Sequence, residues 1–253
     1  MDTMNERRDR IAGFVNENGS VSFRQLKELL PNVSEMTLRT DLKALDEERR
    51  IVRIHGGAKS VDVVIGTDDL LGNRTIRNQS AKRQIAEKAL QLIKPHTTIY
   101  IDSGSTTTQL ARIFPDQPQI IYTSGLSCAN ELAKLEQPHV YLPAGRLNRY
   151  SMSVCGAEGA RELERVNFDI AFMGVTAFSL ESGFTCGVEN EAYLKRSAMR
   201  HAGMRVMLFD LSKIGKHSTF TFAQLEDADI LITEGDLPDS VAEMCRKYDV
   251  EVL

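Results

Sequence analysis

The chain has 253 residues, of which 42% are hydrophobic and 26% are charged, and its net charge at pH 7 is −4. These values exclude a disordered tail and a fibrous protein, and they suit one large or two small globular domains. No stretch reaches the roughly 18 successive apolar residues that a membrane helix needs, and the charged start is unlike a signal peptide, so we expect a cytoplasmic protein without a membrane partner.

The first part of the chain predicts two helices. Two S/T-x-x-E/Q patterns, at residues 3–6 and 22–25, are capping boxes, which satisfy the free amide groups at the start of a helix. The first helix should end near Asn18 and Gly19, which tolerate left-handed geometry, and the second should end at Pro31.

A third helix and a hairpin follow. Ser34 is a good N-cap, and three leucines from Leu38 to Leu45 recur on one face of the helix. The β-prone run at residues 51–54 leads into two glycines and predicts a hairpin. Three helices followed by a hairpin predict a winged helix-turn-helix domain over residues 1–58.

The polar face of the third helix and the wing are the expected DNA contacts. The start of such a helix usually meets base edges, and basic residues further along meet phosphates. A solvated helix face is the alternative, but the three-helix context favours DNA. Residues 1–60 are close to neutral whereas the remainder is acidic, which is consistent with a DNA-reading head. The expected contacts are Ser34, Glu35, Met36, Thr37, Arg39, Thr40, Lys43, Arg53 and His55.

Residues 59–75 carry little pattern and are expected to be a linker, after which residues 76–253 form an α/β domain. Short apolar runs alternate there with helical stretches, which predicts a doubly wound, mostly parallel sheet with helices on both faces. The expected strands are residues 98–101, 120–122, 140–142, 170–173, 206–209, 230–232 and 250–253. The expected helices include residues 80–93, 105–114 and 189–201.

The segment after the first of these strands suits phosphate binding. In an open α/β sheet, ligands bind outside the carboxyl ends of the strands. Gly104 permits close backbone approach, residues 105–108 supply hydroxyls, and the next helix directs its N-terminal amides to the same place. The pattern is not a Walker A loop, which argues against an NTPase. The alternative is that Ser105 only caps the helix.

Charged residues after other strands can complete such a site. Arg146 and Lys213 would neutralise a bound phosphate. Asp102 and Asp210 would accept hydrogen bonds from sugar hydroxyls. For each of these residues, the alternative is a solvated loop charge or a cap on the following turn.

Glu191 and Lys195 are spaced i, i+4, with the glutamate first. The simple explanation is an ion pair on the surface of a helix. We also keep both residues as second-rank candidates for binding a ligand.

Metal and cofactor sites are not expected. The cysteines at positions 128, 155, 186 and 245 form no CxxC pair, and the histidines are dispersed. This pattern gives neither a disulfide framework nor a zinc site. We therefore expect reduced, mostly structural thiols, no metal and no cofactor.

Several motifs, taken together, resemble the DeoR family of bacterial repressors. They run in order through nearly the whole chain, so the resemblance is specific. The motifs are VSEMTLRTDL at 33–42, VRIHGGA at 52–58, Arg74, Asn78 and Lys82, DSGSTT at 102–107, AGRL at 144–147, DIAFMG at 169–174, GFT at 183–185, EAYLKR at 191–196 and DLSK at 210–213.

The resemblance implies a winged-helix DNA-binding head and a sensor domain related to the ribose-5-phosphate isomerase and CoA-transferase folds. A phosphorylated sugar is the implied effector, which agrees with a phosphate loop at Gly104. Carried over position by position, the implied effector contacts are Asp102, Gly104, Ser105, Thr106, Thr107, Ser124, Gly125, Arg146 and Lys213.

We therefore expect a transcriptional repressor of a carbohydrate-metabolism operon, with operator DNA and a sugar phosphate as partners and no catalytic residues. Two heads must reach half-sites about one helical turn apart, which implies a homodimer or homotetramer. The alternative is a sugar-phosphate isomerase that uses Asp102, Glu191 and Lys213 as acid–base groups. Fold alone does not transfer function, and an isomerase needs no DNA-reading head.

Overall fold

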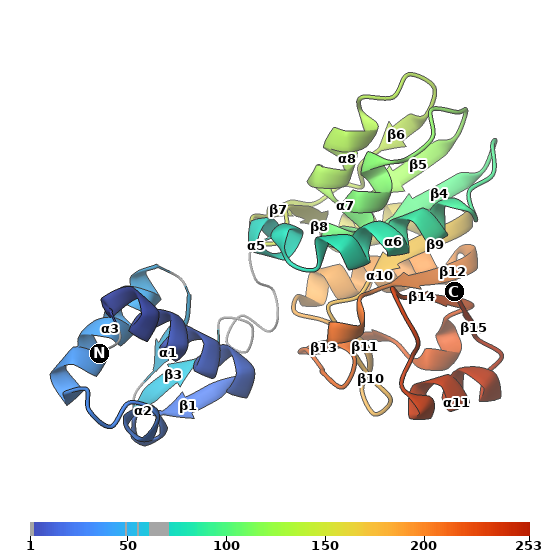
Figure 1. Cartoon of the computed structure of the whole chain (residues 1–253). Helices are drawn as coiled ribbons and strands as arrows, with labels where there is room; N and C mark the ends of the chain where they lie inside the picture. The colour runs from blue at the N-terminus through green and yellow to red at the C-terminus, as the bar shows by residue number, and fades with distance from the viewer. Residues whose placement is uncertain (1–2, 49, 55, 61–70) are drawn as a thin grey trace. The chain divides into compact units, whose positions relative to one another are not determined.

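The computed structural model describes residues 3–48, 50–54, 56–60 and 71–253 (Figure 1). The chain divides into two compact units, Met1–Asp69 and Leu70–Leu253, and each is described by itself. His55, one of the expected DNA contacts, and residues 61–70 of the expected linker lie outside the described residues.

The first unit contains three helices and a small antiparallel sheet. The helices are α1 (Met4–Asn18), α2 (Phe23–Leu29) and α3 (Glu35–Glu47). The strands are β1 (Ser20–Ser22), β2 (Val52–Ile54) and β3 (Gly57–Lys59), in the order β1-β3-β2. The predicted winged helix-turn-helix is confirmed, and β1 is an additional strand that pairs with the wing.

Helix starts in this unit follow the predicted chemistry. Both capping boxes are present, one between Thr3 and Glu6 and one between Ser22 and Gln25. Gly57 lies where the wing meets β1, and a Cβ atom there would lie 2.1 Å from the carbonyl oxygen of residue 21. Only glycine allows the strands to approach this closely.

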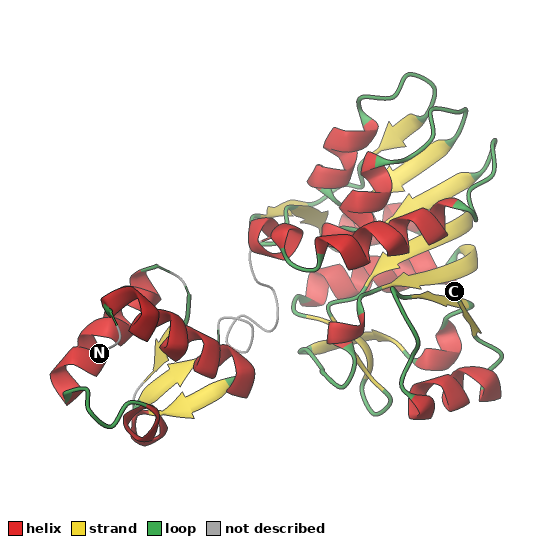
Figure 2. Ribbon diagram, in the orientation of Figure 1, coloured by secondary structure: helices red, strands yellow, loops and turns green. Residues whose placement is uncertain are grey.

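The second unit is built on a seven-stranded, fully parallel sheet in the order β15-β14-β12-β9-β4-β5-β6 (Figure 2). Each apolar run singled out in the sequence contributes one strand. The bounds are β4 (Thr98–Ile101), β5 (Ile120–Thr123), β6 (His139–Tyr141), β9 (Phe168–Gly174), β12 (Ala202–Leu208), β14 (Ile230–Ile232) and β15 (Glu251–Val252).

Helices cover both faces of this sheet. They are α5 (Leu71–Ile76), α6 (Gln79–Leu90), α7 (Ser105–Arg112), α8 (Leu126–Leu132), α9 (Ala157–Leu163), α10 (Glu189–Arg200), α11 (Asp239–Lys247) and the short 3-10 helices η1 (Leu211–Lys213) and η2 (Leu225–Asp227). Within the expected linker of residues 59–75, Lys59 belongs to β3 and α5 begins at Leu71.

Two apolar clusters show why the sheet is doubly wound. Ile99 and Ile101 of β4 pack into the cluster that contains residues of α6, α7 and α8. Tyr100, between them, packs into the cluster that contains residues of α9, α10 and α11. Because successive side chains of a strand point to opposite faces, a strand that is apolar throughout needs helices on both sides. The predicted fold class is confirmed.

Two small antiparallel sheets lie beside the main one and are absent from the sequence prediction. One consists of β10 (Ala177–Ser179), β11 (Gly183–Cys186) and β13 (Phe220–Ala223). The other pairs β7 (Arg146–Asn148) with β8 (Ser153–Cys155). Within the described residues, no helix combines the length and the apolar character required to cross a bilayer.

Candidate functional site

The residues expected to contact DNA lie on the exposed face of α3 and on β2. Leu38, Leu42 and Leu45 are buried in the core of the first unit, so the opposite face of α3, which carries most of the expected contacts, is exposed. Met36 is 75% exposed although it is apolar, which leaves it accessible to a partner. Ser34, Glu35, Arg39, Thr40, Lys43 and Arg53 are exposed as well, and Thr37 is half-buried.

Two of these side chains also stabilise α3 through hydrogen bonds to its backbone. The Ser34 hydroxyl accepts a hydrogen bond from the Thr37 backbone N–H at 3.1 Å and so caps α3. The Thr40 hydroxyl donates to the Met36 carbonyl at 2.9 Å. The N-cap role of Ser34 is confirmed.

Arg39 and Lys43 have only weak contacts within the unit. The Arg39 guanidinium lies 4.8 Å from the centre of the Phe23 ring, and its Nη2 lies 4.0 Å from Glu35 Oε2. Lys43 Nζ lies 3.7 Å from Glu47 Oε1. Exposed pairs of this kind contribute about 0.2–1 kcal/mol, so a DNA phosphate can replace them.

A buried carboxylate fixes α3 against α1. Asp41 is 1% exposed, and its two oxygens accept hydrogen bonds from Arg7 Nε at 2.6 Å and Arg8 Nε at 3.1 Å. The Arg53 backbone N–H donates to Asp46 at 2.9 Å and joins the wing to the same helix. A signal for Asp41 exists in the sequence, because the residue lies three positions after Leu38 on the apolar stripe.

In the second unit, a cavity lies at the carboxyl ends of β4 and β9. Its wall is formed by the start of α7, the end of β9, α10, η1, helices α5 and α6, and the turn between β7 and β8. The expected effector contacts that line it are Gly104, Ser105, Thr106, Glu191, Lys195 and Lys213. The other lining residues are Arg74, Lys82, Ser103, Ser151, Gly174, Val175 and Thr176.

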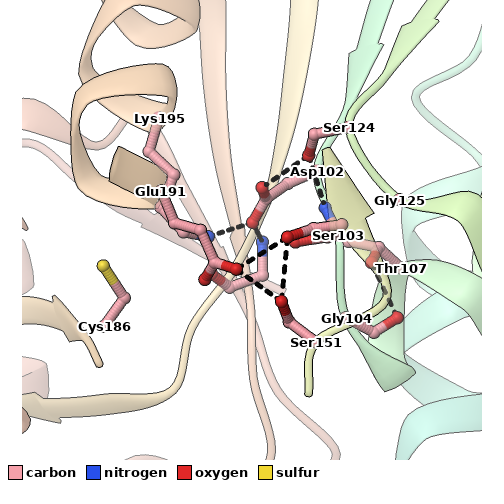
Figure 3. Close-up of polar contacts among 12 residues, drawn as sticks. Asp102, Ser103, Gly104, Thr107, Ser124, Gly125, Ser151, Cys186, Glu191 and Lys195 are labelled. Carbon is pink, nitrogen blue, oxygen red and sulfur yellow. Dashed lines mark hydrogen bonds and ion pairs between the residues drawn. The ribbon is translucent and has the colours of Figure 1, made fainter. Parts of the chain in front are cut away.

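Asp102 and Lys195 form a buried ion pair at the base of the cavity (Figure 3). Lys195 Nζ contacts Asp102 Oδ2 and donates to the Gly174 carbonyl at 2.9 Å, while the Gly174 N–H donates to the same carboxylate at 3.0 Å. Burial raises the pKa of the Asp102 carboxyl, and the Lys195 ammonium opposes that shift. Burial lowers the pKa of Lys195, but Asp102, Cys186 and Glu191 together outweigh burial, so the net shift of the pKa is upward.

Glu191 binds three side chains of the β7–β8 hairpin. Its Oε1 accepts hydrogen bonds from Ser151 Oγ at 2.5 Å, Ser153 Oγ at 2.7 Å and Asn148 Nδ2 at 3.1 Å. The proposed surface pair with Lys195 is therefore wrong. Both side chains are buried on the cavity side of α10, and Lys195 pairs with Asp102 instead.

Positive charge gathers on the opposite wall of the cavity. Lys82 is 3% exposed and donates to the backbone carbonyls of Arg74 and, at 2.7 Å, Arg77. Burial lowers the pKa of Lys82 to about 8, the Asp210 carboxylate opposes this, and the charges of Lys213 and both arginines lower it further. Arg74 and Lys82 stand in the family-like motif before the first strand, but the sequence does not show that α5 and α6 bring them to the loop at Gly104.

Two expected effector contacts lie behind the cavity wall. The Thr107 hydroxyl donates to the Gly104 carbonyl at 3.0 Å and stabilises the first turn of α7. The Ser124 hydroxyl donates to Asp102 at 3.4 Å (Figure 3). Neither residue is among those that line the cavity.

Three further residues that were expected to bind the effector also lie outside the lining of the cavity. A Cβ atom on Gly125 would lie 3.0 Å from Ser103 Cα, so this glycine lets the second loop pack against the first. Arg146 is exposed on β7 and does not line the cavity. Asp210 caps η1 by accepting from the Ser212 N–H, as its alternative interpretation predicts.

The cysteines have structural positions. All four are buried, and none of them is in a disulfide. Burial raises the pKa of the Cys128 thiol to about 11, which keeps it protonated and unreactive at neutral pH. Among the described residues, no three His, Cys, Asp or Glu side chains gather as a metal site.

Comparisons with known proteins agree with this architecture. Residues 7–64 match the family described as the DeoR-like helix-turn-helix domain, and residues 77–235 match the DeoR C terminal sensor domain. The chain is 34% identical to the HTH-type transcriptional regulator GlpR of Haloferax volcanii over 249 residues, which cover 98% of this chain and 96% of that protein. It is 32% identical to a putative aga operon transcriptional repressor of Escherichia coli O157:H7 over 250 residues, covering 98% and 93%.

Solved structures show similarity at low sequence identity. Ribose 5-phosphate isomerase A of Methanocaldococcus jannaschii is 18% identical, with a TM-score of 0.41 and coverage of 54% of this chain and 55% of that one. The two family matches together span both units and rule out the isomerase alternative, because they identify a transcriptional regulator. The chain belongs to the DeoR family of transcriptional regulators.

Proposed function

We propose that this regulator represses a carbohydrate-metabolism operon, and that a phosphorylated sugar bound in the cavity of the second unit sets its affinity for operator DNA. The observation that carries the proposal is the lining of the cavity itself, which combines cationic side chains and the start of α7 with one carboxylate, Glu191, and several hydroxyl groups. One relative is named as a lactose phosphotransferase system repressor, and another as a putative aga operon transcriptional repressor.

The phosphate group would bind at the start of α7. The amide groups in the first turn of a helix have no intrahelical acceptor, and the helix dipole favours an anion there. Ser105 and Thr106 bring these amides to the cavity, and Lys213 adds a positive charge from η1. Phosphate binding by helix amides and a lysine follows common chemistry.

The sugar hydroxyls would meet the opposite wall. Glu191 uses Oε1 for the β7–β8 hairpin, and its position on the cavity lining leaves the carboxylate accessible to a hydroxyl donor. Ser151 lines the same wall. Asp102 and Lys195 neutralise each other beneath, so they hold the loop after β4 in place.

On DNA, Arg39, Lys43 and Arg53 would contact phosphates, and Glu35, Met36 and Thr37 would face base edges. Their support is the exposed surface of α3 and the wing. The regulator would bind as a homodimer or homotetramer, because operators with two half-sites match symmetric proteins. It would act in the cytoplasm, where the DNA is.

An effector changes operator affinity only through its different affinity for the DNA-competent and DNA-incompetent states. A coupling of about 1–3 kcal/mol, or roughly 5–150-fold in affinity, is typical.

A thermal-shift screen of the full chain tests the effector class. The panel contains pentose and hexose phosphates and the corresponding unphosphorylated sugars. We expect stabilisation by at least one sugar phosphate and by no unphosphorylated sugar, and a loss of that shift in Lys213→Ala. Lys216→Ala is the matched control, since Lys216 is an exposed lysine three residues further along. Equal shifts with a sugar and its phosphate would contradict the proposal.

A further inference from the structure

The geometry points to Arg74 as an anion-binding residue that links the cavity to the start of the second unit. The guanidinium holds the phosphate group of the effector, and binding thereby fixes α5, the first element after the residues that connect the two units. This inference rests on the proposed function, since it describes how a ligand in the same cavity affects α5.

The first observation is that two nitrogens of the Arg74 guanidinium are buried without an acceptor. Arg74 lines the cavity, and its Nε and Nη2 are both buried with no hydrogen-bond partner within the described part of the chain. An arginine cannot lose its proton to escape this situation. Leaving buried charged donors unpaired destabilises the folded protein, so such a group in a native structure needs an explanation. A bound anion supplies the missing acceptors.

The second observation is the charge of the neighbouring groups. Arg74, Arg77 and Lys213 all lie close enough to Lys82 to act on it electrostatically. The nearby carboxylate of Asp210 already accepts hydrogen bonds from Asn78 Nδ2 at 3.0 Å and from residue 212.

The other two carboxylates of the cavity are also engaged. Asp102 pairs with Lys195, and Glu191 binds the β7–β8 hairpin. Asp102, Glu191 and Asp210 therefore all have hydrogen-bond partners other than Arg74.

The third observation identifies a tetrahedral oxyanion as the ligand. Ser105 and Thr106 at the start of α7 line the same cavity as Arg74 and Lys213. A guanidinium offers two parallel N–H donors, a lysine offers a point charge, and helix amides offer further donors. A phosphate has enough oxygen acceptors to meet all three kinds of group at once.

The position of α5 gives the anion a structural consequence. The Leu71 N–H donates to the Tyr150 carbonyl at 2.8 Å, in the turn that Glu191 binds through Ser151. Lys82 Nζ holds the Arg74 carbonyl in the second half of the helix. The start of α5 is therefore held by Tyr150, next to the cavity residue Ser151, and its second half is held by the cavity residue Lys82. An anion bound to Arg74 would add a third contact.

The test compares Arg74→Met, Arg74→Lys and a control, Arg83→Met, in the full chain. Arg83 is exposed on α6 and pairs with Glu87, so its loss removes an equal charge away from the cavity. Affinity for inorganic phosphate is measured by calorimetry, and melting temperature is measured in phosphate and in chloride of equal ionic strength. Amide hydrogen exchange of residues 71–78 is followed with and without phosphate.

We expect Arg74→Met to weaken phosphate binding about tenfold or more, and Arg74→Lys to retain part of the affinity because it keeps a point charge. Without phosphate, Arg74→Met should melt at the same temperature as the wild type or higher, since a buried unpaired charge is removed. A purely structural arginine would give the opposite sign. Phosphate should slow amide hydrogen exchange of residues 71–78 in the wild type and in Arg83→Met. It should not slow this exchange in Arg74→Met, even at a phosphate concentration that saturates the variant.

Wild-type phosphate affinity in Arg74→Met would overturn the binding role and leave the proposed function intact. Phosphate binding without slower exchange in residues 71–78 would overturn the link to α5. If neither phosphate nor any sugar phosphate binds the wild type, both proposals fail. If a sugar phosphate binds more tightly than inorganic phosphate, the phosphate group that Arg74 binds belongs to the effector. If the two bind equally tightly, the sugar does not contribute to binding, and only the role of Arg74 in phosphate binding stands.

Discussion

Lys195 of α10 contacts Asp102 beyond the end of β4, and both side chains are almost completely buried. Ninety-three positions separate them in the chain, so the contact fixes the helix against the sheet at the floor of the cavity. Removal of one charge from a buried pair leaves the other without compensation, which costs about 3–5 kcal/mol.

Asp102→Asn and Lys195→Met should therefore each lower the free energy of unfolding by about 3–5 kcal/mol. The double variant should lose clearly less than the sum of the two, because no charge is left unpaired. Urea denaturation measures all three. Arg83→Ala, which breaks an exposed pair, is the control and should change stability by less than about 1 kcal/mol. Additive losses would show that the two residues do not act as a pair.

Asp41 should stabilise the first unit through α1 and α3. Asp41→Asn removes the charge that binds Arg7 and Arg8, and we expect a loss of about 2 kcal/mol, the range for hydrogen bonds to charged groups. Asp9→Asn is the control, because Asp9 is exposed and pairs with a half-exposed arginine. Thermal unfolding of the full chain, followed by a probe on the first unit, should show a lower transition for Asp41→Asn alone. Equal transitions would contradict the role of Asp41.

Arg39 should contribute to operator binding. If it meets a phosphate, Arg39→Ala reduces the slope of log affinity against log salt by about 1, and if it reads a base, the variant relaxes sequence preference. Arg24→Ala is the matched control, because Arg24 is a highly exposed arginine on α2. Fluorescence anisotropy at several salt concentrations distinguishes the two modes. An unchanged slope together with unchanged preference would remove Arg39 from the interface.

Lys82 should give a pH dependence of stability. Its pKa is about 8 in the folded protein and 10.5 as the ordinary value, so the unfolded chain binds more protons between these pH values. The free energy of unfolding of the wild type should therefore rise relative to Lys82→Met between pH 8 and about 10.5. Urea denaturation at half-unit pH steps measures the difference. A constant difference across this window would mean that burial does not shift the lysine.

The strands and helices could be predicted because each carries a local pattern. The leucines of α3 repeat with the helical period, and Ile99 and Ile101 with Tyr100 between them mark a strand that is apolar on both faces. The β7–β8 hairpin and the sheet containing β10 could not be predicted in this way. Their strands, such as Arg146–Asn148 and Ser153–Cys155, mix polar and apolar residues and lack the apolar runs that mark the main sheet.

The candidate site could be predicted most directly where it follows a strand. Gly104, Ser105 and Lys213 come directly after strands, and the topology brings them together as expected. Arg74 reaches the same cavity from α5, which precedes the first strand of the sheet. Its place depends on tertiary packing rather than on local pattern, and so does the burial of Glu191.

The most direct test of the central claim is operator affinity measured with and without the sugar phosphate that stabilises the protein. Anisotropy titrations would use DNA from the promoter region next to the gene, with wild type, Lys213→Ala and Lys216→Ala. We predict that the sugar phosphate changes the affinity of the wild type and of Lys216→Ala roughly 5–150-fold, whereas Lys213→Ala binds the operator normally and does not respond. An undiminished response in Lys213→Ala, or no response in the wild type, would contradict the account.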